Sequence, residues 1–307
     1  MDKKKMLFLS LLVMLLWGSL FPMVKMGYAA FGVVTTADIL FFAGVRFTVC
    51  GALICLYCMI KDRRTFVPVK STLLPVLLSG VFAIILHYSF TYMGLKLTDS
   101  SKTAILKQIG VLFYVCFSAL FFKDDRLTVK KLIGVLLGFA GIIAINVSTE
   151  GIAFCVGDAL IIAASFCTVF SNVISKKVFD RVEPITATGV SQLFGGAVLL
   201  LAGKGMGGGM YMGWNASAWI MVYICIASIF GYCIWFWVVK RGELSKLFII
   251  KFAEPVFASL FGALLLGENI LKPQYLAAFL LIAAGITISN LDMKNRVKLG
   301  ENANDGN

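Results

Sequence analysis

Long apolar segments restrict this chain more than any motif does. Near its start the chain reads LFLSLLVMLLWGSLF, and comparable runs recur as far as residue 291. Of the 307 residues, 60% are hydrophobic and 14% are charged, whereas soluble domains carry about 25% charged residues. The polar surface is therefore too small to cover a water-soluble body of this size. The pattern predicts an all-α integral membrane protein, because helices satisfy their own backbone hydrogen bonds within lipid.

About 17–25 consecutive apolar residues are needed to cross a bilayer as a helix. On that criterion we predict ten transmembrane helices, over residues 7–26, 38–60, 72–93, 102–121, 132–148, 157–175, 185–203, 217–238, 247–266 and 274–291. The first of them resembles a secretory signal peptide, but the many spans that follow favour an uncleaved transmembrane helix.

Basic residues predict how these helices are oriented. If the N-terminus is cytoplasmic, 20 of the 28 Lys and Arg residues fall in cytoplasmic segments and 5 on the opposite side. Such an excess is typical of the cytoplasmic face, so we expect both termini there, in the plasma membrane of a prokaryote. The net charge of +12 then reflects topology, and no nucleic-acid partner is needed to explain it.

The two halves of the chain resemble each other. When residues 98–146 are compared with residues 242–290, 16 of 49 positions are identical, including Lys107 with Lys251. The same shift places Tyr88 opposite Tyr232. We therefore predict two copies of a five-helix unit, at 1–148 and 149–291, followed by a polar cytoplasmic tail at 292–307.

Five is an odd number, so the two copies have opposite orientations in the membrane. Inverted repeats of this kind are typical of secondary transporters, whose substrate site lies near the midplane between the repeats. We expect the ten helices to surround a central cavity that binds a small molecule, with the lipid bilayer outside.

Ionisable residues within spans are costly and usually face a cavity or another helix. Lys107 and Lys251 each lie near the predicted start of a helix, where the helix dipole adds positive potential. From opposite sides they would flank the midplane and favour an anionic ligand. Two structural interpretations stay open: snorkelling of each long side chain to the interface, and an ion pair of Lys251 with Glu254.

Other polar and aromatic residues within spans are candidates for the same cavity. Pro255 follows Glu254 and interrupts the helical hydrogen bonds, which predicts a bend there; Gly110-Val111 stands at the equivalent place. The remaining candidates are polar or aromatic side chains of the first, second, third, seventh and eighth spans: Trp17, Arg46 with its counterpart Gln192, His87, Tyr88, Tyr92, Tyr232 and Trp235. His87 fits either a proton relay or a structural role, and the aromatic residues fit either a cavity wall or interfacial belts.

We interpret the glycines and cysteines of the spans as packing residues. A glycine stripe on the fifth span and a glycine on the tenth suit close helix packing, within the chain or across a homodimer: Gly134, Gly138, Gly141 and Gly285. Cys55 and Cys58 form a CxxC with no partner pair, so we expect packing and no metal. The sequence contains no nucleotide-binding motif, so we expect no cofactor and no ATP-driven transport.

Several of these residues match a known pattern. Trp17-Gly18-Ser19 with Phe21, Arg46-Phe47 and the stretch EPVFASLFGALLLGENILKPQYLAAFLLIAAGI, from Glu254 to Ile286, resemble the EamA family of the drug/metabolite transporter superfamily. The resemblance covers almost the whole chain. It implies carriers of metabolites such as amino acids, drugs or nucleotide sugars, with ten helices around a cavity and the fifth and tenth helices peripheral. Lys107 and Lys251 are not part of that general pattern.

Together these observations predict a secondary-active permease for an anionic or zwitterionic metabolite, such as an amino acid or organic acid. One alternative is an exporter of lipophilic cations or drugs, with Glu254 as the anionic partner. Another is a membrane-embedded enzyme, for which one histidine and one intramembrane glutamate are thin support. We expect no enzymatic activity.

Overall fold

The computed structural model describes residues 3–61, 70–95, 97, 106–146, 154–211, 218–267 and 273–291. Throughout this part of the chain the secondary structure is helical, as predicted. Some predicted positions lie outside the described residues, namely the start of the 102–121 span, the last two residues of the 132–148 span, the first residue of the 217–238 span and the whole 292–307 tail.

The helices of the first half follow the predicted spans. They are α1 (Lys3–Phe31), α2 (Thr36–Lys61), the continuous run of α4 (Lys70–Gly80), η1 (Val81–Leu86) and α5 (His87–Leu95), then α7 (Ile109–Phe121) and α8 (Val129–Asn146). The segment η1 is a π-helix, and π-helical turns are frequent at functional sites. It ends immediately before His87.

The second half repeats this order. It comprises α9 (Val156–Val178), α10 (Pro184–Gly205), α11 (Ala218–Arg241), the broken pair α12 (Leu244–Ile250) and α13 (Ala253–Leu266), and α14 (Pro273–Leu291). Among the described residues, eight helical segments are long and apolar enough to cross a membrane, and α7 is a shorter apolar helix. The chain is therefore a multi-span helical membrane protein.

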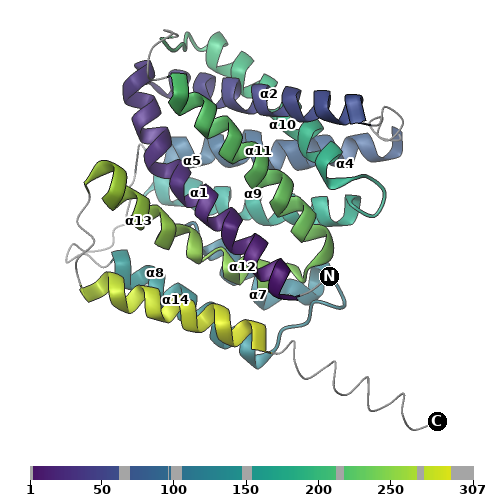
Figure 1. The fold of residues 1–307 in the computed structure, drawn as a ribbon, viewed down its shortest axis with the longest axis vertical. Coiled ribbons are helices and arrows are strands. Elements are labelled where there is room, and N and C mark those ends of the chain that lie inside the picture. Colours follow the sequence, from purple (N-terminus) through teal and green to yellow (C-terminus); the bar gives the residue numbers. More distant parts are fainter. Residues whose placement is uncertain are drawn as a thin grey trace.

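Glycines allow two helix pairs to pack closely. Along α2 and α10, a Cβ added at Gly51 would lie 2.2 Å from the backbone nitrogen of Leu193. Along α8 and α14, a Cβ at Gly134 would lie 2.8 Å from the carbonyl oxygen of Gly285. The glycine stripe thus serves packing within one chain. Figure 1 shows α8 and α14 side by side at one edge of the bundle, where the resemblance placed the fifth and tenth helices.

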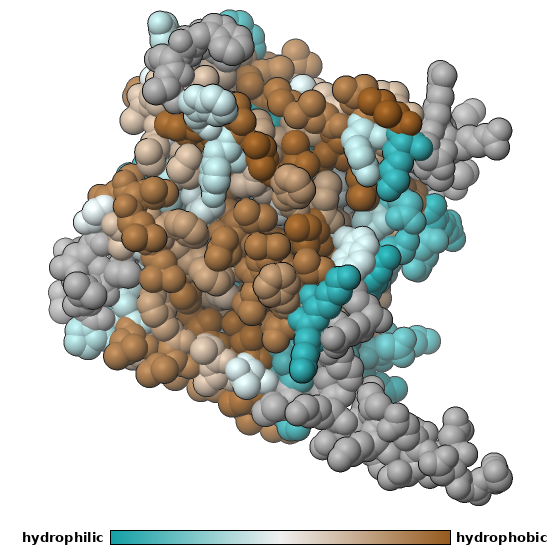
Figure 2. All heavy atoms as spheres, in the orientation of Figure 1, coloured by the Kyte–Doolittle hydropathy of each residue, from teal (hydrophilic) through white to brown (hydrophobic). Residues whose placement is uncertain are grey.

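The surface shows where lipid would lie. Large hydrophobic side chains project outward, such as Leu264, Trp219 and Ile60. Figure 2 shows a broad hydrophobic face over the middle of the molecule, and hydrophilic residues gather toward the edge where Figure 1 places the N-terminus. This is the distribution that a bilayer imposes on a spanning protein.

At that edge, a polar network joins the α7–α8 connection to the start of α12. Asp125 accepts hydrogen bonds from Tyr114 Oη (3.1 Å), Lys131 Nζ (2.7 Å) and the backbone nitrogen of Ser245 (2.9 Å), and another from Ser245 Oγ. Lys131 Nζ also lies 3.0 Å from Glu243 Oε2. Burial alone would raise the pKa of Asp125, but the bonds from Lys131 and Ser245 outweigh burial and hold that pKa below its ordinary value.

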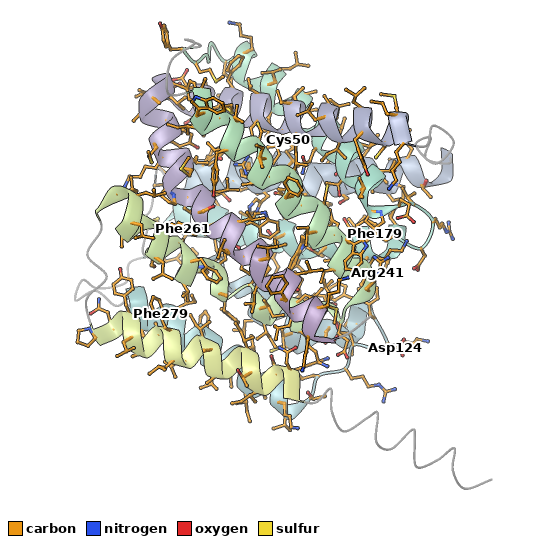
Figure 3. The ribbon with its side chains drawn as sticks, in the orientation of Figure 1. Cys50, Asp124, Phe179, Arg241, Phe261 and Phe279 are labelled. Atoms are coloured by element: carbon orange, nitrogen blue, oxygen red, sulfur yellow. The ribbon has the colours of Figure 1, made fainter. Side chains whose placement is uncertain are left out.

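The cysteines behave as packing residues. Cys55 and Cys58 are free thiols and are buried. Cys50, labelled in Figure 3, lies between α2 and α11 and its thiol donates to the carbonyl oxygen of Cys225 at 3.5 Å.

Candidate functional site

The ninth span is broken at Lys251. Helix α12 ends at Ile250 and α13 begins at Ala253. Pro255 has no N–H to bond the Lys251 carbonyl four residues earlier, and the Glu254 N–H bonds that carbonyl instead, at 3.0 Å. We had expected the bend at Glu254-Pro255. It lies one turn earlier, because a proline frees the carbonyl of the preceding turn.

The first half is interrupted at the equivalent place. From Leu106 the described chain enters α7 only through a turn at Lys107 and Gln108. Here no proline is involved, since Val111 stands where the second half has Pro255. Gly110 lets the start of α7 approach α9, and a Cβ there would lie 2.7 Å from the carbonyl oxygen of Ser165. Both lysines therefore mark helix interruptions.

Aromatic rings surround the two ammonium groups. Lys251 Nζ lies 5.6 Å from the centre of the Trp17 ring and 5.4 Å from that of Trp235. Lys107 Nζ lies 5.4 Å from the Phe21 ring. Within the described residues, neither lysine has a hydrogen-bond partner or a carboxylate within 4.0 Å. The alternative interpretation, an ion pair between Lys251 and Glu254, is therefore not met within 4.0 Å, although the two charges act on each other.

An aromatic wall links this region to the second span. Tyr88 and Tyr232, which the internal repeat aligns, share a hydrogen bond of 3.3 Å between their hydroxyls. Phe47 packs on both, at ring-centre distances of 4.8 Å and 6.0 Å. Tyr92 lies 5.6 Å from Tyr88. These aromatic residues thus cluster in the bundle interior, as a cavity wall requires, and do not form a belt.

Trp17 and Trp235 differ in their polar contacts. Trp235 is 1% exposed, and its Nε1 donates to Asn172 Oδ1 at 2.7 Å. Trp17 packs against Trp235 and Tyr232, and its buried Nε1 has no partner within the described part of the chain. Sequence reasoning missed Asn172; a polar amide within an apolar span was the available signal.

Arg46 and Gln192, the predicted polar pair of the second and seventh spans, are both buried. Arg46 is 4% exposed, and its Nε donates to Ser228 Oγ at 2.9 Å. Its guanidinium carbon lies 4.8 Å from the centre of the Phe47 ring. Gln192 is 1% exposed, and neither atom of its amide has a partner in the described structure.

His87 is anchored to α9. Its Nδ1 lies 3.1 Å from the Ala164 carbonyl oxygen and 3.1 Å from Thr168 Oγ1. A carbonyl oxygen accepts only, so Nδ1 carries the proton in this geometry. The contact fits the structural role, and it leaves Nε2 as the atom available for other chemistry.

The predicted residues therefore form two neighbouring groups. Lys107, Lys251, Glu254 and His87 lie within electrostatic range of one another. Arg46 lies within such range of Tyr88, Tyr92 and Tyr232. Arg46, Gln192 and Trp235 are buried, and the other predicted site residues are partly exposed.

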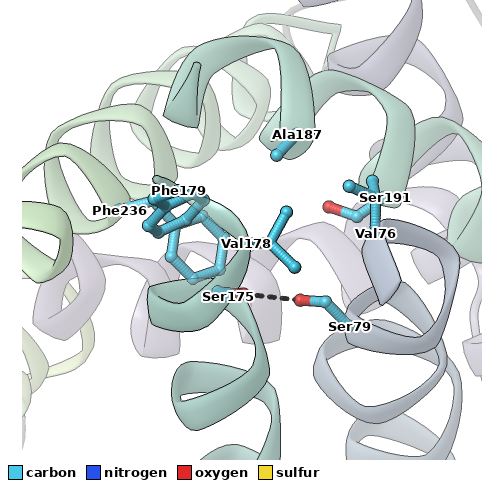
Figure 4. Close-up of a pocket in the computed structure, with 8 residues that line it drawn as sticks. All are labelled: Val76, Ser79, Ser175, Val178, Phe179, Ala187, Ser191 and Phe236. Carbon is cyan, nitrogen blue, oxygen red and sulfur yellow. Dashed lines mark hydrogen bonds between the residues drawn. The ribbon is translucent and has the colours of Figure 1, made fainter. Parts of the chain in front are cut away.

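A small pocket lies elsewhere, between α4, α9, α10 and α11, and Figure 4 shows the eight residues that line it. Ser79 and Ser175 share a hydrogen bond of 2.6 Å across it, and the Phe179 and Phe236 rings pack 5.4 Å apart. None of the predicted site residues is among the eight. We therefore place the candidate site at the interrupted helices and treat the pocket as a packing feature.

Comparison with known proteins decides the family. The EamA-like transporter family matches residues 4–147 and 156–291. The chain belongs to this family. It is 25% identical over 296 residues to the uncharacterized transporter YoaV of Bacillus subtilis, covering 92% of this chain and 96% of that protein. An uncharacterized transporter of Archaeoglobus fulgidus is 24% identical over 270 residues, or 86% of this chain and 91% of the relative.

Two further similarities agree. The uncharacterized inner membrane transporter YedA of Escherichia coli is 24% identical over 278 residues, covering 90% of this chain and 87% of that protein. The crystal structure of another protein superposes with a TM-score of 0.79 over 96% of this chain and 99% of the other, at 20% identity, which shows a shared fold. The chain thus belongs to a transporter family, and the curated relatives that it resembles are named as transporters.

Proposed function

We propose that this transporter-family protein moves small metabolites that carry an anionic group, such as amino acids or organic acids, by secondary-active transport. One observation carries the proposal: three cationic side chains, those of Arg46, Lys107 and Lys251, lie within the spanning segments, and the carboxylate of Glu254 is three residues from Lys251. Within the described residues none of the three cations makes an ion pair with a carboxylate. An unpaired charge in the membrane interior costs about 2.5–3.5 kcal/mol on insertion scales.

A bound anion would offset that cost. At 4 Å and an effective dielectric constant of 20, a pair of opposite unit charges attracts by about 4 kcal/mol. The two ammonium groups at the helix interruptions would bind a carboxylate or phosphate. The carboxylate of Glu254, which has no side-chain partner among the described residues, would accept the ammonium of a zwitterion. The aromatic faces of Trp17, Tyr88 and Tyr232 would pack on the carbon skeleton. Three unpaired cations disfavour the alternative substrate class, lipophilic cations.

We also propose that the chain consists of two inverted five-helix halves, at 1–148 and 149–291. The helix contacts support this, because each has a counterpart in the other half: α1 packs on α11 as α9 packs on α5, and α1 packs on α13 as α9 packs on α7. The asymmetric distribution of Lys and Arg along the sequence supports a plasma-membrane protein with both termini in the cytoplasm. A homodimer remains a prediction.

Ligand-induced thermal shifts on the purified protein test the substrate class. The panel holds anionic, zwitterionic and cationic metabolites, and positive hits go on to uptake by proteoliposomes. We expect stabilisation by one anionic or zwitterionic class, lost in the Lys107→Ala, Lys251→Ala double variant and kept in Lys123→Ala, which changes an exposed lysine. Stabilisation by cations, or by anions equally in all three proteins, would overturn the proposal.

A further inference from the structure

Arg46 is a second cationic centre, apart from the lysine pair. Its guanidinium is held by one hydrogen bond to Ser228 Oγ, whose own hydroxyl donates to the Ile224 carbonyl. Among the described residues, Nη1 and Nη2 have no hydrogen-bond partner. These two nitrogens form the planar edge that binds a carboxylate or phosphate through two parallel hydrogen bonds.

A buried hydroxyl accompanies this edge. Tyr28 on α1 packs edge-on against Phe42, which lies one helical turn before Arg46 on α2, at a ring-centre distance of 5.3 Å. Its hydroxyl is buried and makes no hydrogen bond within 3.5 Å in the described part of the chain; its interaction with the Tyr92 hydroxyl is longer than that. A buried hydroxyl without a close partner is unfavourable. A ligand oxygen that accepts from both Tyr28 and Arg46 would remove that cost.

Three aromatic rings connect the two cationic centres. Phe47 lies under the Arg46 guanidinium and packs on Tyr232 at 6.0 Å. Tyr232 packs on Trp17 at 5.3 Å, and Lys251 Nζ lies 5.6 Å from the Trp17 ring. The two centres are therefore separate, with an apolar face between them and cations at both ends.

From this arrangement we infer that the substrate carries two anionic groups, one bound by Arg46 and Tyr28 and the other by Lys107 and Lys251. The inference rests on the proposed function and narrows its substrate class to dianions with a carbon skeleton long enough to pass the aromatic rings. The planar edge of the Arg46 guanidinium would fix the orientation of one anionic group of the substrate. The two lysine ammonium groups would act as point charges on the other anionic group.

Matched ligands test the inference on the full-length protein in detergent. The probes are linear dicarboxylates from succinate to suberate, each paired with its monoamide, which has the same length and one charge fewer. We expect one dicarboxylate length to bind at least about tenfold more tightly than its monoamide by isothermal titration calorimetry, since about 1.4 kcal/mol corresponds to a factor of ten. Arg46→Gln should remove this difference, and Arg181→Gln, at an exposed arginine, should retain it.

The outcomes separate the two proposals. Equal binding of every diacid and its monoamide by the wild type overturns the two-headed substrate but leaves an anionic substrate in place. An undiminished diacid preference in Arg46→Gln also overturns it. Absence of binding by all of these acids and amides also overturns the two-headed substrate, and the proposed function is then decided by the metabolite panel of the thermal-shift test. If Arg46→Gln does not fold, Tyr28→Phe serves instead, and it should reduce the diacid preference several-fold.

Discussion

Replacing Asp125 by Asn should destabilise the folded protein by about 3 kcal/mol. Each oxygen of Asp125 accepts two hydrogen bonds: Lys131 Nζ and Ser245 Oγ bond one, and Tyr114 Oη and the Ser245 N–H bond the other. An amide in either orientation turns its NH2 toward two donors and removes the negative charge. Removing one partner of a buried ion pair costs about 3–5 kcal/mol. The lower end applies, because Lys131 keeps Glu243 at 3.0 Å.

Equilibrium unfolding in mixed detergent micelles, followed by tryptophan fluorescence, measures this loss. The matched control is Asp124→Asn, which changes an exposed neighbour at the edge of the bundle (Figure 3) and should alter stability by about 0.5 kcal/mol or less. Lys131→Met combined with Asp125→Asn should cost less than the sum of the two single changes, since both remove the same pair. Equal stabilities of the Asp124→Asn and Asp125→Asn variants would refute the reasoning.

The difference in stability between the wild type and Asp125→Asn should depend on pH in a defined way. The pKa of Asp125 is lower in the folded protein than the ordinary value of 3.8, so its contribution is complete above that value and is lost as the pH falls through the folded pKa. The stability difference between wild type and Asp125→Asn should therefore be constant from about pH 5 to 8 and should shrink only in acid. A difference that changes between those limits would point to another titrating group.

Two further changes have clear expectations. Gly51→Val should force α2 away from α10, because even a Cβ there lies 2.2 Å from the Leu193 nitrogen, and should lower folded yield sharply on size-exclusion chromatography; Gly205→Ala, with nothing within 4 Å, should not. Pro255→Ala supplies an N–H at position 255 that can bond the Lys251 carbonyl in place of the Glu254 N–H, so α12 and α13 should join into one helix. Hydrogen exchange at residues 251–255 should then slow, and transport of any substrate found should fall; unchanged exchange would contradict our account of the break.

Much of the site could be predicted from the order of residues. The internal repeat pairs Tyr88 with Tyr232 and Lys107 with Lys251. The structure brings the two tyrosines into hydrogen-bond contact and places aromatic rings near both lysines. The sequence pattern does not predict, however, which residue on another helix each of these side chains contacts. That Asn172 holds Trp235, that Ala164 fixes His87, and that Lys251 has no carboxylate partner among the described residues depend on how separate helices meet.

The sequence by itself predicts that the helices lie in lipid, how many spans there are and where the charged residues fall between them. It does so because the length of each apolar segment, and the cost of placing a charge within one, can be read from the order of residues alone. Tertiary structure decided what each polar residue faces. Asp125 and Ser245 lie 120 positions apart, yet they share a network because the α7–α8 connection and the start of α12 meet at one edge of the bundle. Likewise Arg46 and the lysines became separate centres only when Phe47, Tyr232 and Trp17, from three different helices, packed between them.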